Sequence, residues 1–192
     1  HQRALPIDKI GEFVYKVEND SGHEVIKLSL LLLIYTNVRT NDVRLAEWRD
    51  IDFKSKTWTI PAEKIKMSRA HKVPLSEQSL DTLKQLKQLT GHQTWISKSP
   101  NTIDKPMSEN ALLNLVKRIK MTKYTTVHGL RGTASTYLND QGYRGDVIEK
   151  QLAHEEKNQV RKAYNHAEYW DERIEMSQFW ADHISKEKCK FA

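Results

Sequence analysis

Four residues in the last third of the sequence have the types and the spacing to act on a phosphate. His128 and Arg131 are three positions apart, so a helix that begins here would place an imidazole and a guanidinium on one face. His154 follows, and ten positions later Tyr164 offers a nucleophilic oxygen. Glycines beside His128 and Arg131 leave room for another backbone, including that of a nucleic acid. These types predict attack of a tyrosine on a phosphodiester.

Such a transfer, without a metal ion, needs several fixed cations. The pentavalent phosphate carries extra negative charge, and each donor aimed at its oxygens can change the rate by roughly 100- to 1000-fold. Tyrosine is a poor nucleophile at neutral pH because its free pKa is about 10, and surrounding cations lower that barrier. The sequence offers one arginine directly after an apolar helix and a basic run between two predicted strands. These residues are Arg39, and Lys64, Lys66, Arg69, His71 and Lys72.

Both features also have simpler interpretations. From its position alone, Arg39 could equally be a structural arginine that pairs with Asp42 or Glu47. A basic run in a hairpin is most often a solvated turn, and charges near a β-edge commonly block edge pairing.

Other chemistries have no matching pattern. The eight histidines form neither H-x-x-x-H nor H-E-x-x-H, and the single cysteine, Cys189, excludes a cysteine cluster. A Gly-rich phosphate loop with its lysine and the G-x-S-x-G elbow of serine hydrolases are both absent from the sequence. We therefore expect no metal, no ATP and no other cofactor.

The composition is that of a globular protein with a basic balance. The 192 residues include 31 Lys and Arg against 25 Asp and Glu, which gives +6 and weakly suggests an anionic partner. One cysteine favours a reducing compartment such as the bacterial cytoplasm. The longest apolar run, Leu30 to Tyr35, is too short to cross a bilayer. Because the chain starts at His1, we expect a piece of a longer protein that forms one domain over residues 1–192.

Periodicity predicts a mostly helical α+β domain with a small antiparallel sheet of about three strands. The apolar segment from Val25 to Tyr35 predicts a buried central helix. The other expected helices cover 7–17, 76–89, 108–119, 127–139, 146–152 and 169–184, with 185–192 as a flexible tail. Strands are expected at Thr57–Pro61, at residues 72–75 and, third and shortest, at Trp95–Ser97.

In this arrangement the sequence resembles the catalytic domain of the tyrosine recombinases, in the phage and prophage integrase branch, over nearly its whole length. Residues 30–53, LLLLIYTNVRTNDVRLAEWRDIDF, resemble the first arginine motif, and residues 64–76, KIKMSRAHKVPLS, resemble the lysine hairpin. HGLRGTAST, LAH and AYN match the H-x-x-R, L-G-H and nucleophile motifs, and residues 169–184 resemble the end helix. Order and spacing are matched together. The catalytic positions that the resemblance implies are Arg39, Lys66, His128, Arg131, His154 and Tyr164.

The resemblance implies a role for each of these positions. Tyr164 would form a 3′-phosphotyrosine while Arg39 and Arg131 hold the non-bridging oxygens. His128 and His154 would donate hydrogen bonds, and His128 is also the candidate acceptor of the tyrosine proton. A lysine on the hairpin, at position 66, would protonate the leaving 5′-oxygen. Contacts to the DNA backbone are expected from neighbouring basic residues, which are Lys64, Arg69, His71 and Lys72.

Two departures from the family pattern stand close to these positions. Thr40-Asn41-Asp42 replaces the usual Pro-Gly-Glu, which would alter how Arg39 is supported. Ala153 replaces the usual glycine before His154, which would crowd that loop.

The implied function is site-specific strand exchange on double-stranded DNA attachment sites, for integration or excision of viral or prophage DNA. The family acts as a homotetramer with N-terminal DNA-binding domains, which we expect to lie outside these 192 residues, and with accessory DNA-bending or directionality proteins. Two alternatives remain open: a DNA-binding module that does not cleave, and a relaxing enzyme similar to type IB topoisomerases. Covalent trapping on a nicked substrate would distinguish a recombinase from the non-cleaving module, because only the enzyme is trapped. Relaxation of supercoiled DNA without site preference would indicate the topoisomerase-like enzyme.

Overall fold

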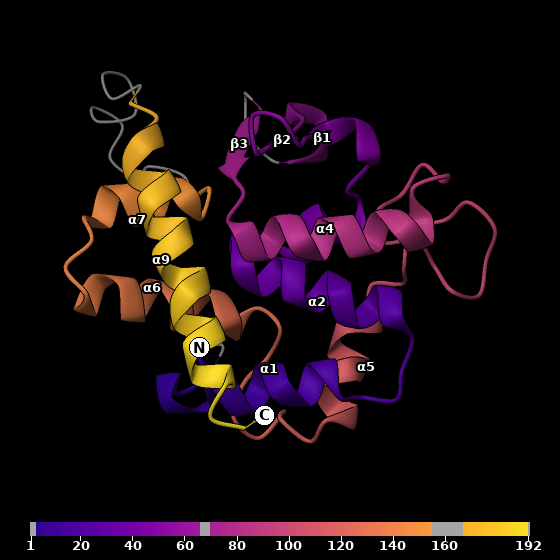
Figure 1. The fold of residues 1–192 in the computed structure, drawn as a ribbon, viewed down its shortest axis with the longest axis horizontal. Coiled ribbons are helices and arrows are strands. Elements are labelled where there is room, and N and C mark those ends of the chain that lie inside the picture. Colours follow the sequence, from indigo (N-terminus) through magenta and orange to yellow (C-terminus); the bar gives the residue numbers. More distant parts are fainter. Residues whose placement is uncertain (1–2, 66–69, 155–166, 192) are drawn as a thin grey trace.

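The computed structural model describes residues 3–65, 70–154 and 167–191, and over these residues it is mainly helical with one small sheet (Figure 1). In chain order the α-helices are α1 (Ile10–Glu18), α2 (Glu24–Thr36), α3 (Thr40–Arg44), α4 (Glu77–Thr90), α5 (Ala111–Arg118), α6 (Gly129–Asp140), α7 (Gly145–Gln151) and α9 (Trp170–Lys188). Short 3-10 helices are η1 (Ile7–Lys9), η2 (Trp48–Asp50) and η3 (Ala62–Lys64).

Helix α2 is the centre of the core, as its all-round apolar sequence predicts. Every residue from Leu28 to Thr36 is buried, and the helix packs against α1, α4, α5 and α9. Each fully buried leucine contributes about 1.5–3 kcal/mol to folding. The helix ends at Asn37, whose φ of 57° is left-handed, a conformation that asparagine adopts more readily than most residues. The chain therefore turns sharply just before Arg39.

The sheet is antiparallel in the order β1-β2-β3, and it lies beyond α4 at the top of Figure 1. Its strands are β1 (Ile51–Asp52), β2 (Thr57–Ile60) and β3 (His71–Pro74). Trp58 pairs with Val73, and both are buried, so this face of the sheet belongs to the core.

The expected third strand at Trp95–Ser97 is wrong. Trp95 makes only an isolated bridge to Glu47, and the third strand is β1. The turn between β1 and β2 includes Lys56 at φ 51°, and this short connection brings Ile51 opposite Trp58. Local closure of a hairpin costs less chain entropy than pairing with a segment some forty positions away.

Helix α9 extends further than the sequence predicted. It continues to Lys188, so residues 185–188, expected to begin a flexible tail, are helical. Its end lies against α1: a Cβ added at Gly11 would overlap the carbonyl of Glu187, and Lys188 Nζ lies 3.0 Å from Glu18 Oε1. These contacts explain why the helix does not end at Ile184. None of the helices in the described ranges is long and apolar enough to cross a membrane.

Candidate active site

Four of the six predicted catalytic residues lie in the described part of the chain, and the structure brings them together from three regions. Arg39 is the N-cap residue of α3, His128 and Arg131 stand at the start of α6, and His154 follows α7. A pocket of about 250 Å³ opens between α6 and the end of α7. It is lined by His128, Gly129, Arg131, Gly132, Ser135, Leu152 and His154. Tyr164, Lys66 and Arg69 lie outside the described residues.

Hydrogen bonds hold both the backbone and the guanidinium of Arg39. Its backbone N–H donates to Asp42 Oδ2 at 2.8 Å, an N-terminal capping bond of α3. Its guanidinium Nη2 donates to the carbonyl oxygen of Ala153 at 2.7 Å. Asp42 therefore supports the backbone of Arg39, and burial raises the pKa of this carboxyl although Arg39 lies beside it.

Arg131 is the most buried member of the group, with 4% of its surface exposed. Nη1 donates to Asn37 O at 2.6 Å, and Nη2 donates to Leu152 O at 2.7 Å. Burial, followed by the charge of Arg39, lowers its pKa to about 10, so the guanidinium stays charged at neutral pH. Its Nε is buried without a hydrogen-bond partner within the described ranges, and Nη1 keeps a second N–H, besides the one that bonds Asn37, that can bind an anion.

The two histidines are exposed, and they differ in their surroundings. Partial burial and the charge of Arg131 lower the pKa of His128, which keeps its imidazole neutral at neutral pH. Nδ1 of His154 lies 2.7 Å from Glu149 Oε2, and Nε2 lies 3.3 Å from Arg131 Nη2. Because a guanidinium only donates, His154 Nε2 accepts, and Nδ1–H donates a hydrogen bond to the carboxylate of Glu149.

The two glycines beside these residues play different roles. A Cβ added at Gly129 would overlap the carbonyl of Arg3, so the space there is filled by the protein's own N-terminal segment. Gly132 is exposed on the pocket, and the nearest atom to an added Cβ is Ala4 Cβ at 3.4 Å. Only Gly132 therefore leaves room for an incoming backbone.

Two of the residues predicted to contact DNA have partners within the fold, and their DNA contacts stay a prediction. Lys64 Nζ lies 2.8 Å from Glu47 Oε1 and 2.7 Å from Asp50 Oδ2, so two carboxylates balance its charge. His71 is 5% exposed, and its Nε2 donates to Gln151 O at 3.3 Å. Burial, and then the charge of Arg173, lowers the pKa of His71 to about 3. Lys72 is exposed, as expected.

Three residues near the site carried no prediction from the sequence, and one of them contacts a catalytic residue directly. Glu149 binds the His154 ring, while Gln151 and Arg173 form a buried pair at 3.0 Å behind the site. Arg173 had a signal, because it falls on the same helical stripe of α9 as Met176 and Trp180. An arginine in a buried stripe must have partners elsewhere in the fold. Gln151 and Glu149 belong to no sequence pattern that distinguishes them from their neighbours.

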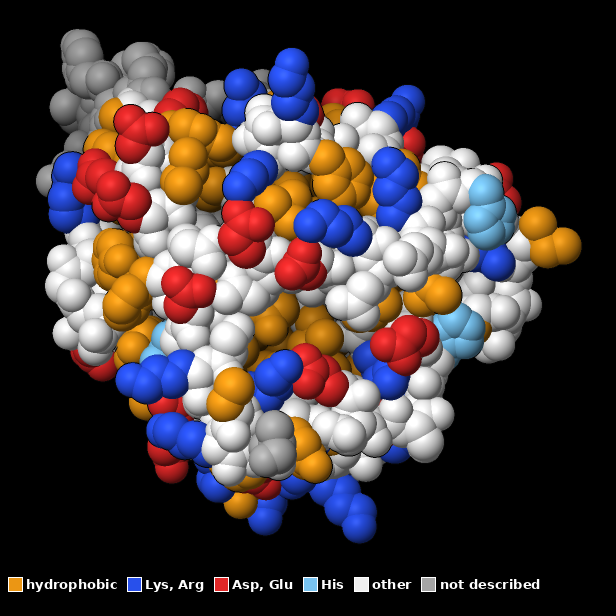
Figure 2. Space-filling view, in the orientation of Figure 1, with side chains coloured by type: hydrophobic (Ala, Val, Ile, Leu, Met, Phe, Trp, Pro, Cys, Tyr) orange, Lys and Arg blue, Asp and Glu red, His pale blue; other side chains and the backbone are white. Residues whose placement is uncertain are grey.

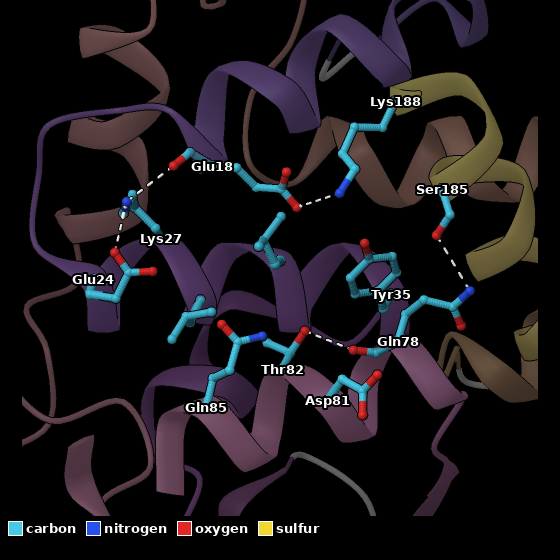
Figure 3. A pocket seen from close by; sticks show the side chains of 12 residues that line it. Glu18, Glu24, Lys27, Tyr35, Gln78, Asp81, Thr82, Gln85, Ser185 and Lys188 are labelled. Atoms are coloured by element: carbon cyan, nitrogen blue, oxygen red, sulfur yellow. Dashed lines mark hydrogen bonds and ion pairs between the residues drawn. The ribbon is translucent and has the colours of Figure 1, made fainter. Parts of the chain in front are cut away.

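A second pocket, of about 340 Å³, lies between α2, α4 and the end of α9, away from these residues (Figure 3). Ion pairs stand on its rim, with Lys27 Nζ 2.7 Å from Glu24 Oε2 and Lys188 Nζ 3.0 Å from Glu18 Oε1. Tyr35 points into it, and burial raises the pKa of this phenol to about 12. At neutral pH a phenol with that pKa forms the nucleophilic phenolate less readily than an ordinary tyrosine does.

Comparisons with known proteins agree with this arrangement. The sequence profile of the phage integrase family matches residues 3–170. Prophage integrase IntA of Escherichia coli K12 is 36% identical over 175 residues, which cover 91% of this chain and 42% of IntA. The integrase of Shigella phage Sf6 is 36% identical over 183 residues, which cover 95% of this chain and 48% of that protein. The chain spans about half the length of the curated relatives it matches.

Solved structures share the fold at low sequence identity. The integrase from mycobacterium phage Brujita superposes with a TM-score of 0.67 at 14% identity, covering 93% of this chain and 57% of that one. The crystal structure of XerA recombinase gives a TM-score of 0.64 at 16% identity, covering 89% and 62%. The expected tyrosine recombinase catalytic-domain fold, mostly helical with a small antiparallel sheet, is confirmed.

Proposed function

This chain belongs to the phage integrase family, and from that membership and the site we propose that it is the catalytic part of a site-specific DNA recombinase. One observation carries the proposal. Two guanidinium groups from distant parts of the chain bind neighbouring carbonyls, those of Leu152 and Ala153, beside two histidines on one pocket. Such a concentration of fixed donors is suited to a phosphodiester in its transition state.

The proposed reaction transfers a phosphoryl group from DNA to the protein and back. The phenol oxygen of Tyr164 forms a bond to phosphorus as the bond to the 5′-oxygen breaks, which leaves a 3′-phosphotyrosine and a 5′-hydroxyl. The phenol proton passes to a neutral imidazole, and Lys66 gives a proton to the leaving oxygen. Attack by a 5′-hydroxyl of a second strand reverses these steps and completes the exchange.

The roles of the described residues follow from their contacts. Arg39 and Arg131 bind the non-bridging oxygens with the N–H donors that the carbonyls leave free. His128 is kept neutral by its surroundings, and His154 presents an unprotonated Nε2 toward Arg131. The imidazole of His128 can therefore take a proton directly, and His154 is a second candidate base once Arg131 turns its Nη2 donor from His154 to the phosphate.

The partner we propose is double-stranded DNA, bound by a homotetramer of the complete protein in the bacterial cytoplasm, with accessory proteins controlling bending and direction. Support comes from a related fold, the lambda integrase, whose structures include a dimer bound to a core site and a tetramer bound to a Holliday junction. Acidic and basic side chains are mixed on the face shown in Figure 2, so that face offers no single-sign surface for DNA. Of the predicted DNA contacts that the structure describes, Lys72 remains available at the surface.

Covalent trapping tests this function and separates it from its alternatives. The chain is incubated with nicked duplexes whose flanks are randomised, so that cleavage next to the nick releases a short fragment and prevents religation. A recombinase leaves a protein–DNA adduct that survives denaturation and enriches particular sequences. Retention of DNA without any adduct would indicate a non-cleaving module, and adducts without sequence enrichment would indicate a topoisomerase-like enzyme.

A further inference from the structure

Residues 151–153 present three consecutive carbonyl oxygens, each of which accepts a hydrogen bond from a side chain in a distant part of the chain. We call these residues the carbonyl segment. The bonds run from His71 Nε2 to Gln151 O at 3.3 Å, from Arg131 Nη2 to Leu152 O at 2.7 Å, and from Arg39 Nη2 to Ala153 O at 2.7 Å. The carbonyl segment therefore sets the separation of the two arginines.

The side chain of Gln151 holds the carbonyl segment in place from behind. It is 3% exposed, and both ends of its amide are occupied. Nε2 donates to Thr36 O at 2.9 Å, at the end of α2, and Oε1 accepts from Arg173 Nε at 3.0 Å. The carbonyl of Asn37, the next residue after Thr36, accepts a hydrogen bond from Arg131 Nη1. One amide thus links the end of α2 and helix α9 to the segment that binds both arginines.

Arg173 extends this link to the sheet. It is 0% exposed, and its Nη2 donates to the carbonyl of Lys72 at 2.5 Å, beside His71 on β3. Burying a guanidinium is costly unless its donors are satisfied, so the position of Arg173 depends on Gln151 as an acceptor. Loss of either side chain would leave the carbonyl segment without its support.

We propose that Gln151, supported by Arg173, is a positioning residue that fixes the two guanidinium groups of Arg39 and Arg131 for one phosphate. The inference rests on the proposed function. Donors stabilise a transition state only when they are already in place, and a displacement of about 1 Å far from the chemistry can cost roughly 100-fold in rate. Gln151 touches no reacting atom, so its effect must appear through the arginines.

A pair of substrates separates positioning of the arginines from general loss of structure. One trapped duplex is synthesised with its normal scissile phosphate and again with a methylphosphonate, which lacks one charged oxygen. A neutral centre needs less positive charge, so misplaced arginines should matter less. The variant is Gln151→Met. The matched control is Gln78→Met, which removes an amide of α4 that donates to Asp182 of α9. Release of the labelled 5′-hydroxyl fragment gives the rate.

The expected result is a loss of roughly 100-fold for Gln151→Met on the phosphate and a loss at least about tenfold smaller on the methylphosphonate. Gln78→Met should match the wild type on both. If Gln151→Met does not fold, Arg173→Lys decides, because it keeps the charge but lacks the Nε donor and should show the same difference between substrates. Equal losses on both substrates, or no loss on the phosphate, would overturn the proposal.

The reactions of the wild-type protein distinguish a failure of this inference from a failure of the proposed function. Fragment release and an adduct from wild type, with no substrate-dependent defect in the variants, would refute only the role of Gln151. A wild type that binds the duplex but never releases the fragment would refute the proposed function and this inference together.

Discussion

Nδ1 of the His154 imidazole lies 2.7 Å from Oε2 of Glu149, five positions earlier in the chain, and this contact orients the ring. Because Nδ1–H donates a hydrogen bond to the carboxylate, the ring presents the Nε2 lone pair to Arg131 at 3.3 Å. A carboxylate that orients an imidazole is a recurring arrangement wherever histidine accepts a proton.

Replacing Glu149 should therefore slow cleavage without preventing DNA binding. General acid–base groups contribute roughly 100- to 10,000-fold, and loss of orientation alone should cost about tenfold to 100-fold in Glu149→Ala. Glu149→Gln keeps an acceptor oxygen and should lose less. Rates of adduct formation at saturating DNA measure this, with Glu175→Ala, an exposed glutamate on α9, as control. Equal rates for wild type and Glu149→Ala would show that the contact has no role.

His71 should make stability depend on pH in the acid range. Its pKa is about 3 in the folded chain, against about 6.5 when unfolded, because the buried imidazole resists protonation. The unfolded chain thus binds one more proton between these values. The free energy of unfolding should fall by up to about 1.4 kcal/mol per pH unit as the pH drops from about 6.5 toward 3, and this contribution should be constant above 6.5.

The comparison that isolates this effect is urea unfolding of wild type and His71→Gln across the same pH range. The variant is expected to be less stable at pH 7, yet its stability should decline less steeply with acid by about one proton. Parallel curves for the two proteins would mean that His71 titrates normally and is not buried as described.

Ala153 should tolerate glycine with a gain in stability. Its φ of 50° lies in the left-handed region, which costs about 1–2 kcal/mol for a residue with a Cβ. Glycine removes that cost but gives the unfolded chain more freedom, so Ala153→Gly should stabilise the fold by up to about 1 kcal/mol. Thermal unfolding measures the change. A destabilised glycine variant would indicate that the backbone here does not have this conformation.

Gly11 should not tolerate alanine. An added Cβ would overlap the carbonyl of Glu187 where α1 meets the end of α9, and such overpacking typically costs about 1–3 kcal/mol. Gly132→Ala is the matched control, because its Cβ would approach nothing closer than 3.4 Å and alanine is favoured in a helix by about 1 kcal/mol. Urea unfolding of both variants should separate them. Similar stabilities would contradict the close packing of α1 on α9.

Much of the site could be predicted from the sequence because its residues occur in short motifs with fixed spacing. His128 and Arg131 are three positions apart at a helix start, and Arg39 follows the apolar helix that the structure places at the centre of the core. The ion pairs of Lys64 and the burial of His71 could not be predicted. Gln151 lies 80 positions from His71, and nothing in the hairpin sequence distinguishes an inward side chain from an outward one.

The fold, like the site, could be predicted where its determinants are local in the sequence. Helices with a strong apolar stripe were predicted nearly at their bounds, because burial and local propensity agree there. The third strand was not, because β1 has two residues and its pairing depends on the turn at Lys56. Helix α9 was predicted too short because contacts with α1, rather than its own sequence, extend it to Lys188.

The role of Tyr164 as the nucleophile is tested most directly by identifying the residue that carries DNA after trapping. The adduct is digested with protease and nuclease, and mass spectrometry locates the remaining nucleotide on one peptide. We predict a 3′-linked nucleotide on Tyr164 and no adduct from Tyr164→Phe, which should still bind the duplex. A nucleotide on another residue, or an undiminished adduct from Tyr164→Phe, would show that Tyr164 is not the nucleophile.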